Sequence, residues 1–364
     1  MNIRIYEDEG YKNFLPLTWT RPVYALRCGI STLAEKIALQ YPKAKIEFSS
    51  RYYLPGKKTM KHEKGLFING RVLASEKMAK EIPLKGPDEI FVADDGVVAV
   101  RAVTKSFEEV KKRAKTKKVK IRVVKYPWDL IKYNGEQINA DWKHLRGKWR
   151  SGKKVERSVV FYNRMHIHIE EDVEIGANSV IDARGGPVYI GKGTIVRPLT
   201  YLKGPLSIGP VCRVGGEIGE SIFHGYVNKQ HYGFIGHSYV GEWVNLGAGT
   251  TNSDLKNNYS NVRVMVEGQE IDTGEQFVGC VIGDHAKTGI GTLINTGAVI
   301  GLGANVIGGK VTGKHIPDFS WNGKERYRIE DFLKTAAVVM GRRGVKMGEN
   351  EARLLEFIFR QTKA

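Results

Sequence analysis

The chain has 364 residues, 41% of them hydrophobic and 26% charged, which is typical of a folded protein with room for two domains. No window approaches about 18 consecutive apolar residues, and the amino terminus MNIRIYEDEG lacks the basic-then-apolar pattern of a secretion signal. We therefore expect a cytoplasmic protein that does not span a membrane. Its net charge of +18 would attract nucleic acid, an anionic membrane or phosphate-rich small molecules.

Two local patterns reduce the number of partner classes that the charge allows. The densest basic run, VKKRAKTKKVK at 110–120, contains no aromatic residue, whereas proteins that bind single-stranded nucleic acid use aromatic side chains for stacking. The three cysteines, Cys28, Cys212 and Cys280, lie far apart and form neither a disulfide framework nor a CxxC metal motif. We expect small phosphate-bearing ligands, and neither nucleic acid nor a membrane.

Residues 1–150 alternate strand-like and helix-like segments, which predicts a mixed α/β domain. NIRIY at 2–6 and KVKIRVV at 118–124 are rich in β-forming residues. A helix is predicted over 31–42, where Thr32 and Glu35 form a capping box. The segment 90–100, IFVADDGVVAV, predicts a hairpin that turns at Asp95-Gly96.

From about residue 160 the chain follows a period of six. The repeated aliphatic positions are Ile169, Ile175 and Ile181; Ile190, Val196, Leu202, Ile208 and Val214; Phe234, Val240 and Leu246; and Ile282, Thr288, Ile294, Ile300 and Val306. Neither an ordinary strand nor a helix has this period, but a parallel β-helix does, with three hexads in each triangular coil. We therefore predict a β-helix domain over 151–325.

Two segments depart from the repeat. Residues 247–280 break the six-residue frame and are too long for a corner, so we expect an excursion from the β-helix. Residues 326–364 predict a C-terminal helical segment, with one helix ending at Gly341 and a second carrying Leu354, Leu355, Ile358 and Phe359 on one side.

The stretch HYGFIGHSYVGEWVNLGAGT at 231–250 resembles the acetyltransferase half of the bifunctional enzymes that make UDP-N-acetylglucosamine. His231, Asn245 and GAGT at 247–250 match that family in identity and spacing. SDLKNNYSNVRV at 253–264, LPLTWTRPVYALRCGI at 15–30 and YPWDLIKYNGEQI at 126–138 are closer to the GlmU-family sugar nucleotidyltransferases. The resemblance implies a left-handed β-helix, a degenerate nucleotidyltransferase-like α/β domain and a homotrimer.

The sequence also departs from the family. Standard sugar nucleotidyltransferases open with a strand, a glycine-rich loop ending in Arg and a Pro-Lys pair, whereas this chain has EDEGYKNFLPLTWTRP. Phe234 stands where the acetyltransferases have a substrate-binding tyrosine, and Asp254 replaces an asparagine. These differences put pyrophosphorylase-type activity in question and allow a different acceptor sugar.

The resemblance implies acetyl transfer from acetyl-CoA to an amino sugar 1-phosphate. His231 would be the general base, because histidine titrates near the working pH. Asn245, together with Phe234 and Asp254, would contact the acceptor, and Lys229 and Arg213 would bind phosphate. The backbone N–H around Ala248 would stabilise the oxyanion, and Gly289 and Gly297 would let the pantetheine arm of coenzyme A approach the backbone.

In the first domain, Arg21, Arg27 and Lys36 are candidates for binding the triphosphate of UTP or dTTP. Asp94 and Asp129 are candidate Mg²⁺ ligands for nucleotidyl transfer. A structural role is the alternative for both aspartates, because Asp94 belongs to a turn and Asp129 can cap a helix.

Two other functions stay open. The chain could be a non-catalytic protein that binds a nucleotide sugar and acts in regulation or assembly. It could also be a zinc-dependent hydratase of the gamma carbonic anhydrase type, which would need three histidine ligands. The candidates for those ligands are His166, His168, His224, His231, His237 and His285.

Overall fold

The computed structural model describes residues 2–54, 64–145, 154–308 and 310–362. The chain divides into two compact units, which comprise residues 1–14, 21–27 and 31–129, and residues 15–20, 28–30 and 130–364. The domain boundary expected between residues 150 and 151 lies outside the described residues, so the three expected domains stay a prediction.

The first unit is a mixed sheet with helices. Its six strands lie in the order β2-β1-β3-β6-β5-β7, with β1 parallel to β2 and β3, and β6 antiparallel to β3 and β5. The strands are β1 Ile3–Tyr6, β2 Ile46–Ser49, β3 Gly65–Asn69, β5 Glu89–Ala93, β6 Gly96–Ala102 and β7 Thr116–Lys118, beside the pair β4 Val72–Leu73 and β8 Arg122–Val123. The helices are η1 Glu9–Phe14, η2 Val23–Ala25, α1 Leu33–Gln40, α2 Met78–Glu81 and α3 Phe107–Arg113.

The helix cap and the hairpin predicted in this unit are present, and the structure corrects the position of the turn and the extent of one strand. The Thr32–Glu35 capping box is present at α1. The hairpin β5–β6 also forms, but Ala93 pairs with Gly96, so the turn residues are Asp94 and Asp95. The predicted strand 118–124 is split between β7 and β8, which pair with β5 and β4 and so belong to different sheets.

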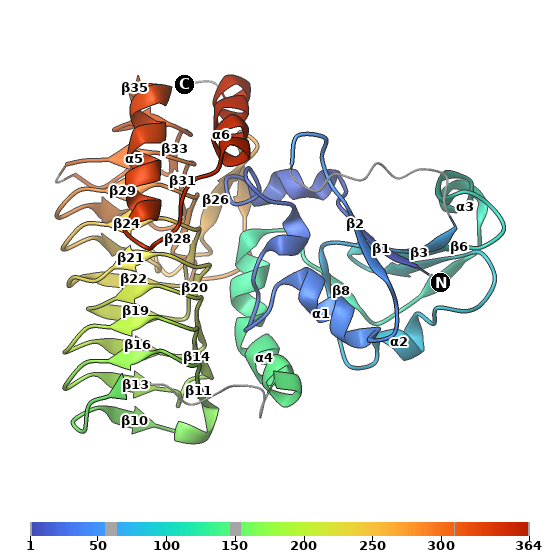
Figure 1. The fold of residues 1–364 in the computed structure, drawn as a ribbon, viewed down its shortest axis with the longest axis horizontal. Coiled ribbons are helices and arrows are strands. Elements are labelled where there is room, and N and C mark those ends of the chain that lie inside the picture. The colour runs from blue at the N-terminus through green and yellow to red at the C-terminus, as the bar shows by residue number, and fades with distance from the viewer. Residues whose placement is uncertain (1, 55–63, 146–153, 309, 363–364) are drawn as a thin grey trace. The chain divides into compact units, whose positions relative to one another are not determined.

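The second unit contains a parallel β-helix whose coils pass through three faces in turn (Figure 1). Face 1 consists of β9 Lys154–Val155, β12 Glu174–Ile175, β15 Ile195–Val196, β18 Arg213–Val214, β21 Asn228–Lys229, β24 Asn245–Leu246, β29 Lys287–Thr288, β32 Asn305–Val306, β34 Ser320–Trp321 and β35 Glu325–Arg326. Face 2 consists of β10 Val160–Tyr162, β13 Val180–Asp182, β16 Tyr201–Lys203, β19 Glu217–Gly219 and β22 Phe234–Gly236, followed by β25 Thr251–Asn252 and β30 Leu293–Ile294. Face 3 follows η3 Arg164–His166 and consists of β11 Ile167–Ile169, β14 Val188–Ile190, β17 Leu206–Ile208, β20 Ile222–Phe223, β23 Tyr239–Val240, β28 Cys280–Ile282, β31 Ala298–Ile300 and β33 His315–Ile316.

The six-residue repeat supplies the interior of this β-helix. Nearly all of the predicted aliphatic positions are buried in one continuous core, from Ile169 to Val306. The repeat fails after Val214, because the corner between β18 and β19 has two residues, Gly215 and Gly216, instead of four. Lys229 takes the interior position beside Val214. One coil later the interior positions Ile235 and Val240 are five residues apart instead of six, so Ile235 is buried in place of the predicted Phe234.

The other predicted elements of this unit are present as well. The excursion leaves after β25 and forms the hairpin β26 Arg263–Val266 and β27 Gln269–Asp272 before β28 resumes the coil. Helices α5 Ile329–Gly341 and α6 Glu349–Gln361 form the C-terminal segment. The predicted fold class is confirmed: an α/β domain, a left-handed parallel β-helix and C-terminal helices.

Helix α4, Pro127–Leu145, runs beside face 3 (Figure 1). Ser207 donates a hydrogen bond to Asn134 over 2.9 Å, and the ring of Trp142 stacks on His168 with centroids 3.9 Å apart. These contacts attach the part of α4 from residue 130 onward to the β-helix.

Candidate active site

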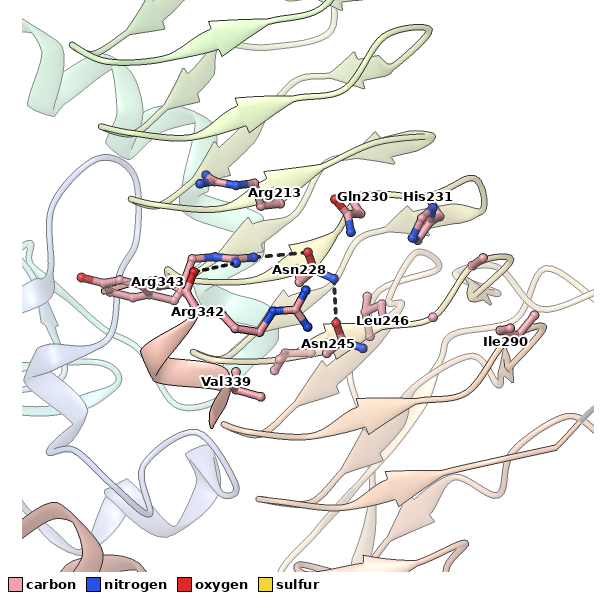
Figure 2. Close-up of a pocket in the computed structure, with 14 residues that line it drawn as sticks. Arg213, Asn228, Gln230, His231, Asn245, Leu246, Ile290, Val339, Arg342 and Arg343 are labelled. Atoms are coloured by element: carbon pink, nitrogen blue, oxygen red, sulfur yellow. Dashed lines mark hydrogen bonds between the residues drawn. The ribbon is translucent and has the colours of Figure 1, made fainter. Parts of the chain in front are cut away.

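A cavity of about 560 Å³ lies over face 1 at the level of β18, β21 and β24. His231, from the corner after β21, lies on one side of it, and Arg342 and Arg343, which follow α5, lie on the other (Figure 2). Ala248, from the corner after β24, also lines the cavity. The side chains of Asn228 and Asn245 project between these two sides and are joined by a hydrogen bond of 2.6 Å. The cavity can therefore hold a ligand that reaches from a cationic end to the imidazole.

Three arginines form the cationic end. Arg213 projects from β18, and Arg342 and Arg343 follow α5. The half-buried Arg343 donates to Asn228 over 3.3 Å, and burial together with the charges of Arg213 and Arg342 lowers its pKa. Among the described residues no carboxylate lines this cavity, and the buried Nε of Arg343 has no hydrogen-bond partner there. Like charges held together without an acid favour the binding of an anion.

The structure brings together four of the residues predicted for acyl transfer: His231, Asn245, Ala248 and Arg213. His231 is exposed, and its position on a corner is fixed by the strands β21 and β22 on either side. Asn245 is the outward-facing residue of β24, because its neighbour Leu246 points into the core. The roles assigned to these four residues stay predictions.

Lys229 is not in the cavity. Its side chain is 2% exposed and fills an interior position, and its ammonium donates to the carbonyl oxygens of Gly215 at 2.9 Å and His231 at 2.7 Å. Burial lowers the pKa of Lys229 to about 8. This position does not favour the predicted contact with a phosphate.

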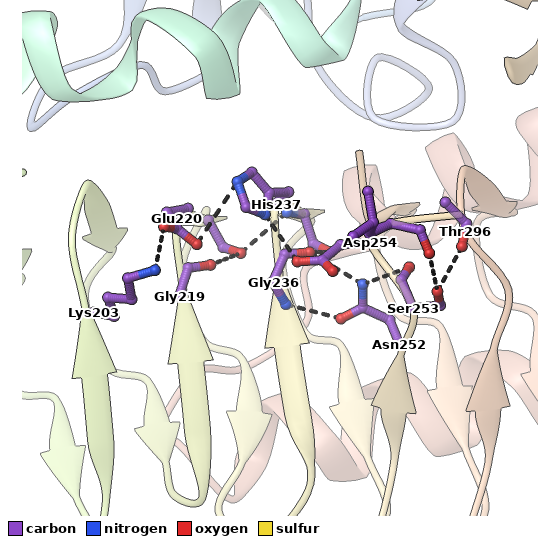
Figure 3. Close-up of polar contacts among 12 residues, drawn as sticks. Lys203, Gly219, Glu220, Gly236, His237, Asn252, Ser253, Asp254 and Thr296 are labelled. Carbon is purple, nitrogen blue, oxygen red and sulfur yellow. Dashed lines mark hydrogen bonds and ion pairs between the residues drawn. The ribbon is translucent and has the colours of Figure 1, made fainter. Parts of the chain in front are cut away.

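Phe234 begins β22 on face 2 and Asp254 follows β25, and neither residue lines this cavity. Figure 3 shows Asp254 beside His237. Asp254 accepts a hydrogen bond from His237 over 2.8 Å, and the other ring nitrogen of His237 is 3.7 Å from Glu220. Glu220 pairs in turn with Lys203 at 2.8 Å. Asp254 therefore belongs to a chain of charges at the base of the inserted segment.

The two predicted coenzyme A glycines are also outside the residues that line the cavity. Gly289 follows β29, and its backbone lies against Gly247, one coil away. Gly297 is buried beside the inserted hairpin, where a Cβ atom would be 2.6 Å from the carbonyl oxygen of Arg263.

The predicted nucleotide-binding cations are dispersed in the first unit. Arg21 lies before η2, Arg27 pairs through its backbone with Thr32, and Lys36 is buried on α1. A different set of charges, which the sequence reasoning missed, lies at the carboxyl ends of the parallel strands.

This missed set consists of two ion pairs. Glu7 accepts from Arg51 at 2.9 Å, and Asp8 accepts from Arg71 at 2.6 Å. The signal was available, because the acidic residues of EDEG directly follow a predicted strand, and ligands of open α/β sheets bind beyond the carboxyl ends of such strands.

The two aspartates proposed as Mg²⁺ ligands lie in a helix cap and in a hairpin turn. Asp129 accepts from the backbone N–H groups of Lys125 and Tyr126 at 2.7 and 3.1 Å, which is helix capping at α4. Asp94 is exposed in the hairpin turn. Within the described parts of the chain, no three His, Cys, Asp or Glu side chains come together in a way that could hold a metal ion.

No helix among the described residues is both long and apolar enough to cross a membrane.

Comparisons with known proteins find one family match and several similar proteins. Residues 3–148 match the family described as Sugar nucleotidyl transferase. The bifunctional sugar-1-phosphate nucleotidylyltransferase/acetyltransferase of Sulfurisphaera tokodaii is 30% identical over 194 residues, 52% of this chain and 45% of that protein. The bifunctional protein GlmU of Acaryochloris marina is 27% identical over 179 residues, 48% of this chain and 34% of that protein.

Among solved structures, UDP-N-acetylglucosamine acyltransferase from Campylobacter jejuni is similar at 15% identity and a TM-score of 0.30, covering 58% of this chain and 97% of that one. This likeness is too low to carry an argument. The chain spans less than half the length of the two curated relatives named above. The resemblance found in the sequence is confirmed: residues 3–148 match the sugar nucleotidyl transferase family, and about half of the chain is similar to bifunctional sugar-1-phosphate nucleotidylyltransferase/acetyltransferases and GlmU proteins.

Proposed function

We propose that the β-helix transfers an acetyl group from acetyl-CoA to the amine of an amino sugar 1-phosphate in the cavity beside His231. One observation carries the proposal: a single cavity joins His231, Asn245 and Ala248 to three arginines. An imidazole at one end and an unbalanced cationic cluster at the other suit a ligand with an amine and a phosphate. The names of the similar curated proteins support the same reaction.

In the proposed reaction, the amine nitrogen attacks the thioester carbonyl carbon, and the carbonyl electrons move onto oxygen. His231 accepts the proton that the amine loses as the C–N bond forms. The backbone N–H of Ala248 is the proposed donor to the oxyanion. When the tetrahedral intermediate collapses, the C–S bond breaks, and the thiolate of coenzyme A takes up the proton from His231.

The arginines would orient the acceptor. Arg213 and Arg343 have planar guanidinium groups, which can bind two oxygens of one phosphate. The amide groups of Asn228 and Asn245 lie between the arginines and His231, where hydroxyl groups of a sugar would lie. Coenzyme A is itself anionic, so the same cations could compete for its phosphates.

The test is an acetyl-transfer assay that follows release of the coenzyme A thiol in the presence of glucosamine 1-phosphate or galactosamine 1-phosphate. His231→Ala should lower kcat by about 10²–10⁴-fold. His166→Ala is the control, because His166 is exposed on η3 and does not line the cavity. Turnover that is the same in the wild type and in His231→Ala would exclude the imidazole as the base.

We also propose that the first unit binds a nucleoside triphosphate, UTP or dTTP, and transfers its nucleotidyl group to a sugar 1-phosphate. The match of residues 3–148 supports this. The ion pairs of Arg51 and Arg71 at the carboxyl ends of parallel strands are the best placed groups for it. Asp94 and Asp129 do not fit a Mg²⁺ site, since one is in a turn and the other caps a helix, so no step is assigned to a metal.

A thermal-shift panel separates this proposal from the non-catalytic alternative. A ligand that binds only the folded protein raises its melting temperature by mass action. Shifts with acetyl-CoA and with an amino sugar phosphate favour the transferase. A shift with a nucleotide sugar alone, without turnover, favours a binding protein that acts in regulation or assembly.

The assembly and the location of the protein complete the proposal. A homotrimer is proposed from the family resemblance, and light scattering coupled to gel filtration would measure it. A cytoplasmic location is proposed as well, because all three cysteines are free thiols and acetyl-CoA is the proposed donor.

A further inference from the structure

A lysine fills one interior position of the β-helix at the height of the proposed site. Lys229 pairs in register with Val214, and Leu246 occupies the corresponding interior position on the next strand of face 1. An aliphatic side chain would suit this position, because a buried ammonium loses its hydration. Among the described residues no carboxylate forms an ion pair with Lys229, so its charge is not balanced by an acid.

The ammonium of Lys229 binds two corners of the β-helix together. It donates to the carbonyl oxygen of Gly215, in the two-residue corner after β18, and to that of His231, in the corner after β21. These corners belong to successive coils. The cation therefore spans the step between two coils and ends on the backbone of the proposed base.

The rest of the His231 corner is tightly packed from both sides. On one side, a Cβ atom at Gly216 would lie 2.9 Å from the carbonyl oxygen of His231. On the other side, the N–H of Gly249 donates to the carbonyl oxygen of Tyr232 over 3.0 Å. The corner has little room to shift as long as the bonds that hold it remain.

We propose that Lys229 is a positioning residue for His231: its buried ammonium fixes the backbone of this corner so that the imidazole stays directed at the cavity. The inference rests on the proposed acetyl transfer. A charge-assisted hydrogen bond to a backbone carbonyl is stronger than a neutral one. Small displacements of a catalytic group have large kinetic effects, since a shift of about 1 Å can cost about 10²-fold in rate.

The chain offers a matched control in Lys287. This lysine is partly buried, burial lowers its pKa to about 8 as well, and its ammonium donates to the carbonyl oxygen of His285 over 2.9 Å. His285 follows β28 and does not line the cavity. Lys287→Met therefore removes a partly buried cation with the same kind of backbone bond, from the same face, without touching the His231 corner.

The kinetic experiment compares Lys229→Met with Lys287→Met in the acetyl-transfer assay, using the full chain. Methionine is an unbranched side chain one atom shorter than lysine, and it removes the donor. We expect kcat to fall about 10²-fold in Lys229→Met, with KM values changed by less than about threefold, and kcat to change little in Lys287→Met. Melting temperatures and circular dichroism spectra establish that both variants are folded. A folded Lys229→Met variant with the wild-type kcat would overturn the proposal.

Hydrogen exchange tests the same contact without reference to any reaction. We expect the N–H of Gly249, which is bonded to the His231 corner, to exchange faster in Lys229→Met and at the wild-type rate in Lys287→Met. Equal exchange at Gly249 in all three proteins would overturn the positioning role. Faster exchange in a chain without acetyl-transfer activity would show that Lys229 fixes the corner while the proposed reaction is wrong.

Discussion

The buried ammonium of Lys229 predicts a distinctive dependence of stability on pH. Burial lowers the pKa of this lysine from 10.5 to about 8 in the folded protein. Between these two values the unfolded chain still binds the proton that the folded chain has released. The free energy of unfolding contributed by Lys229 must therefore rise with pH from about 8 to 10.5 and stay constant below 8.

The size of the effect follows from the same two values. Each tenfold change in proton affinity corresponds to about 1.4 kcal/mol, so the lowering of the pKa from 10.5 to about 8 corresponds to about 3 kcal/mol. Solvent screens this contribution little, because Lys229 is only 2% exposed. Lys229→Met removes the titrating group and with it this rise.

The measurement is guanidinium unfolding of the wild type and of Lys229→Met at several pH values from 7 to 10.5. The difference between their free energies of unfolding should move by about 3 kcal/mol in favour of the wild type over this range. Carrying out the comparison in a Lys287→Met background removes the second lysine whose pKa is about 8. A difference that does not vary with pH would show that Lys229 is hydrated in solution and would refute the buried position.

Three further predictions concern other parts of the β-helix and the cavity. Burial, and then the charge of His166, lowers the pKa of the buried His168 ring to about 4. The free energy of unfolding should therefore fall by about 3 kcal/mol as the pH falls from 6.5 to 4. In His168→Phe, urea unfolding should no longer show this dependence on acid. Phe223 is fully buried, so Phe223→Ala should lower the free energy of unfolding by about 3–5 kcal/mol, measured by chemical denaturation. Val160→Ala is the control, because Val160 is half-exposed. A similar loss in both variants would contradict the assignment of Phe223 to the core. Arg343→Gln should raise KM for the phosphate-bearing acceptor about tenfold, because a hydrogen bond to a charged group contributes about 1.5–3 kcal/mol. Arg353→Gln, on the exposed side of α6, should leave KM unchanged in the same assay. Equal KM values for the two variants would place the phosphate elsewhere.

Much of the fold was predictable because each signal was local. The capping box of α1 involves two residues three positions apart, and the β-helix follows from a spacing repeated over more than a hundred residues. The error at Phe234 has a local cause too. The interior positions Ile235 and Val240 are five residues apart instead of six, so counting in sixes from Val240 selects Phe234, and the period alone does not reveal which step is short.

The candidate site was only partly predictable, because its residues meet through the three-dimensional fold. His231, Asn245 and Arg213 were found from the motif and its neighbourhood, and all three line the cavity. Arg342 and Arg343 are about a hundred residues or more further along the chain, and only the placement of α5 beside face 1 brings them there. The interior position of Lys229 was not predictable, because a lysine near a histidine suggests a ligand contact and nothing local shows that it faces inward.

The inserted hairpin after β25 leaves the coils around it in register. Asn245 pairs directly with Lys287, although 41 residues separate them in the chain, and the hairpin β26–β27 lies within that interval. Each doubling of a flexible loop adds only about 0.6 kcal/mol to the entropic cost of closing it. A longer or different segment can therefore replace this one at small entropic cost, while the scaffold beneath it keeps its geometry.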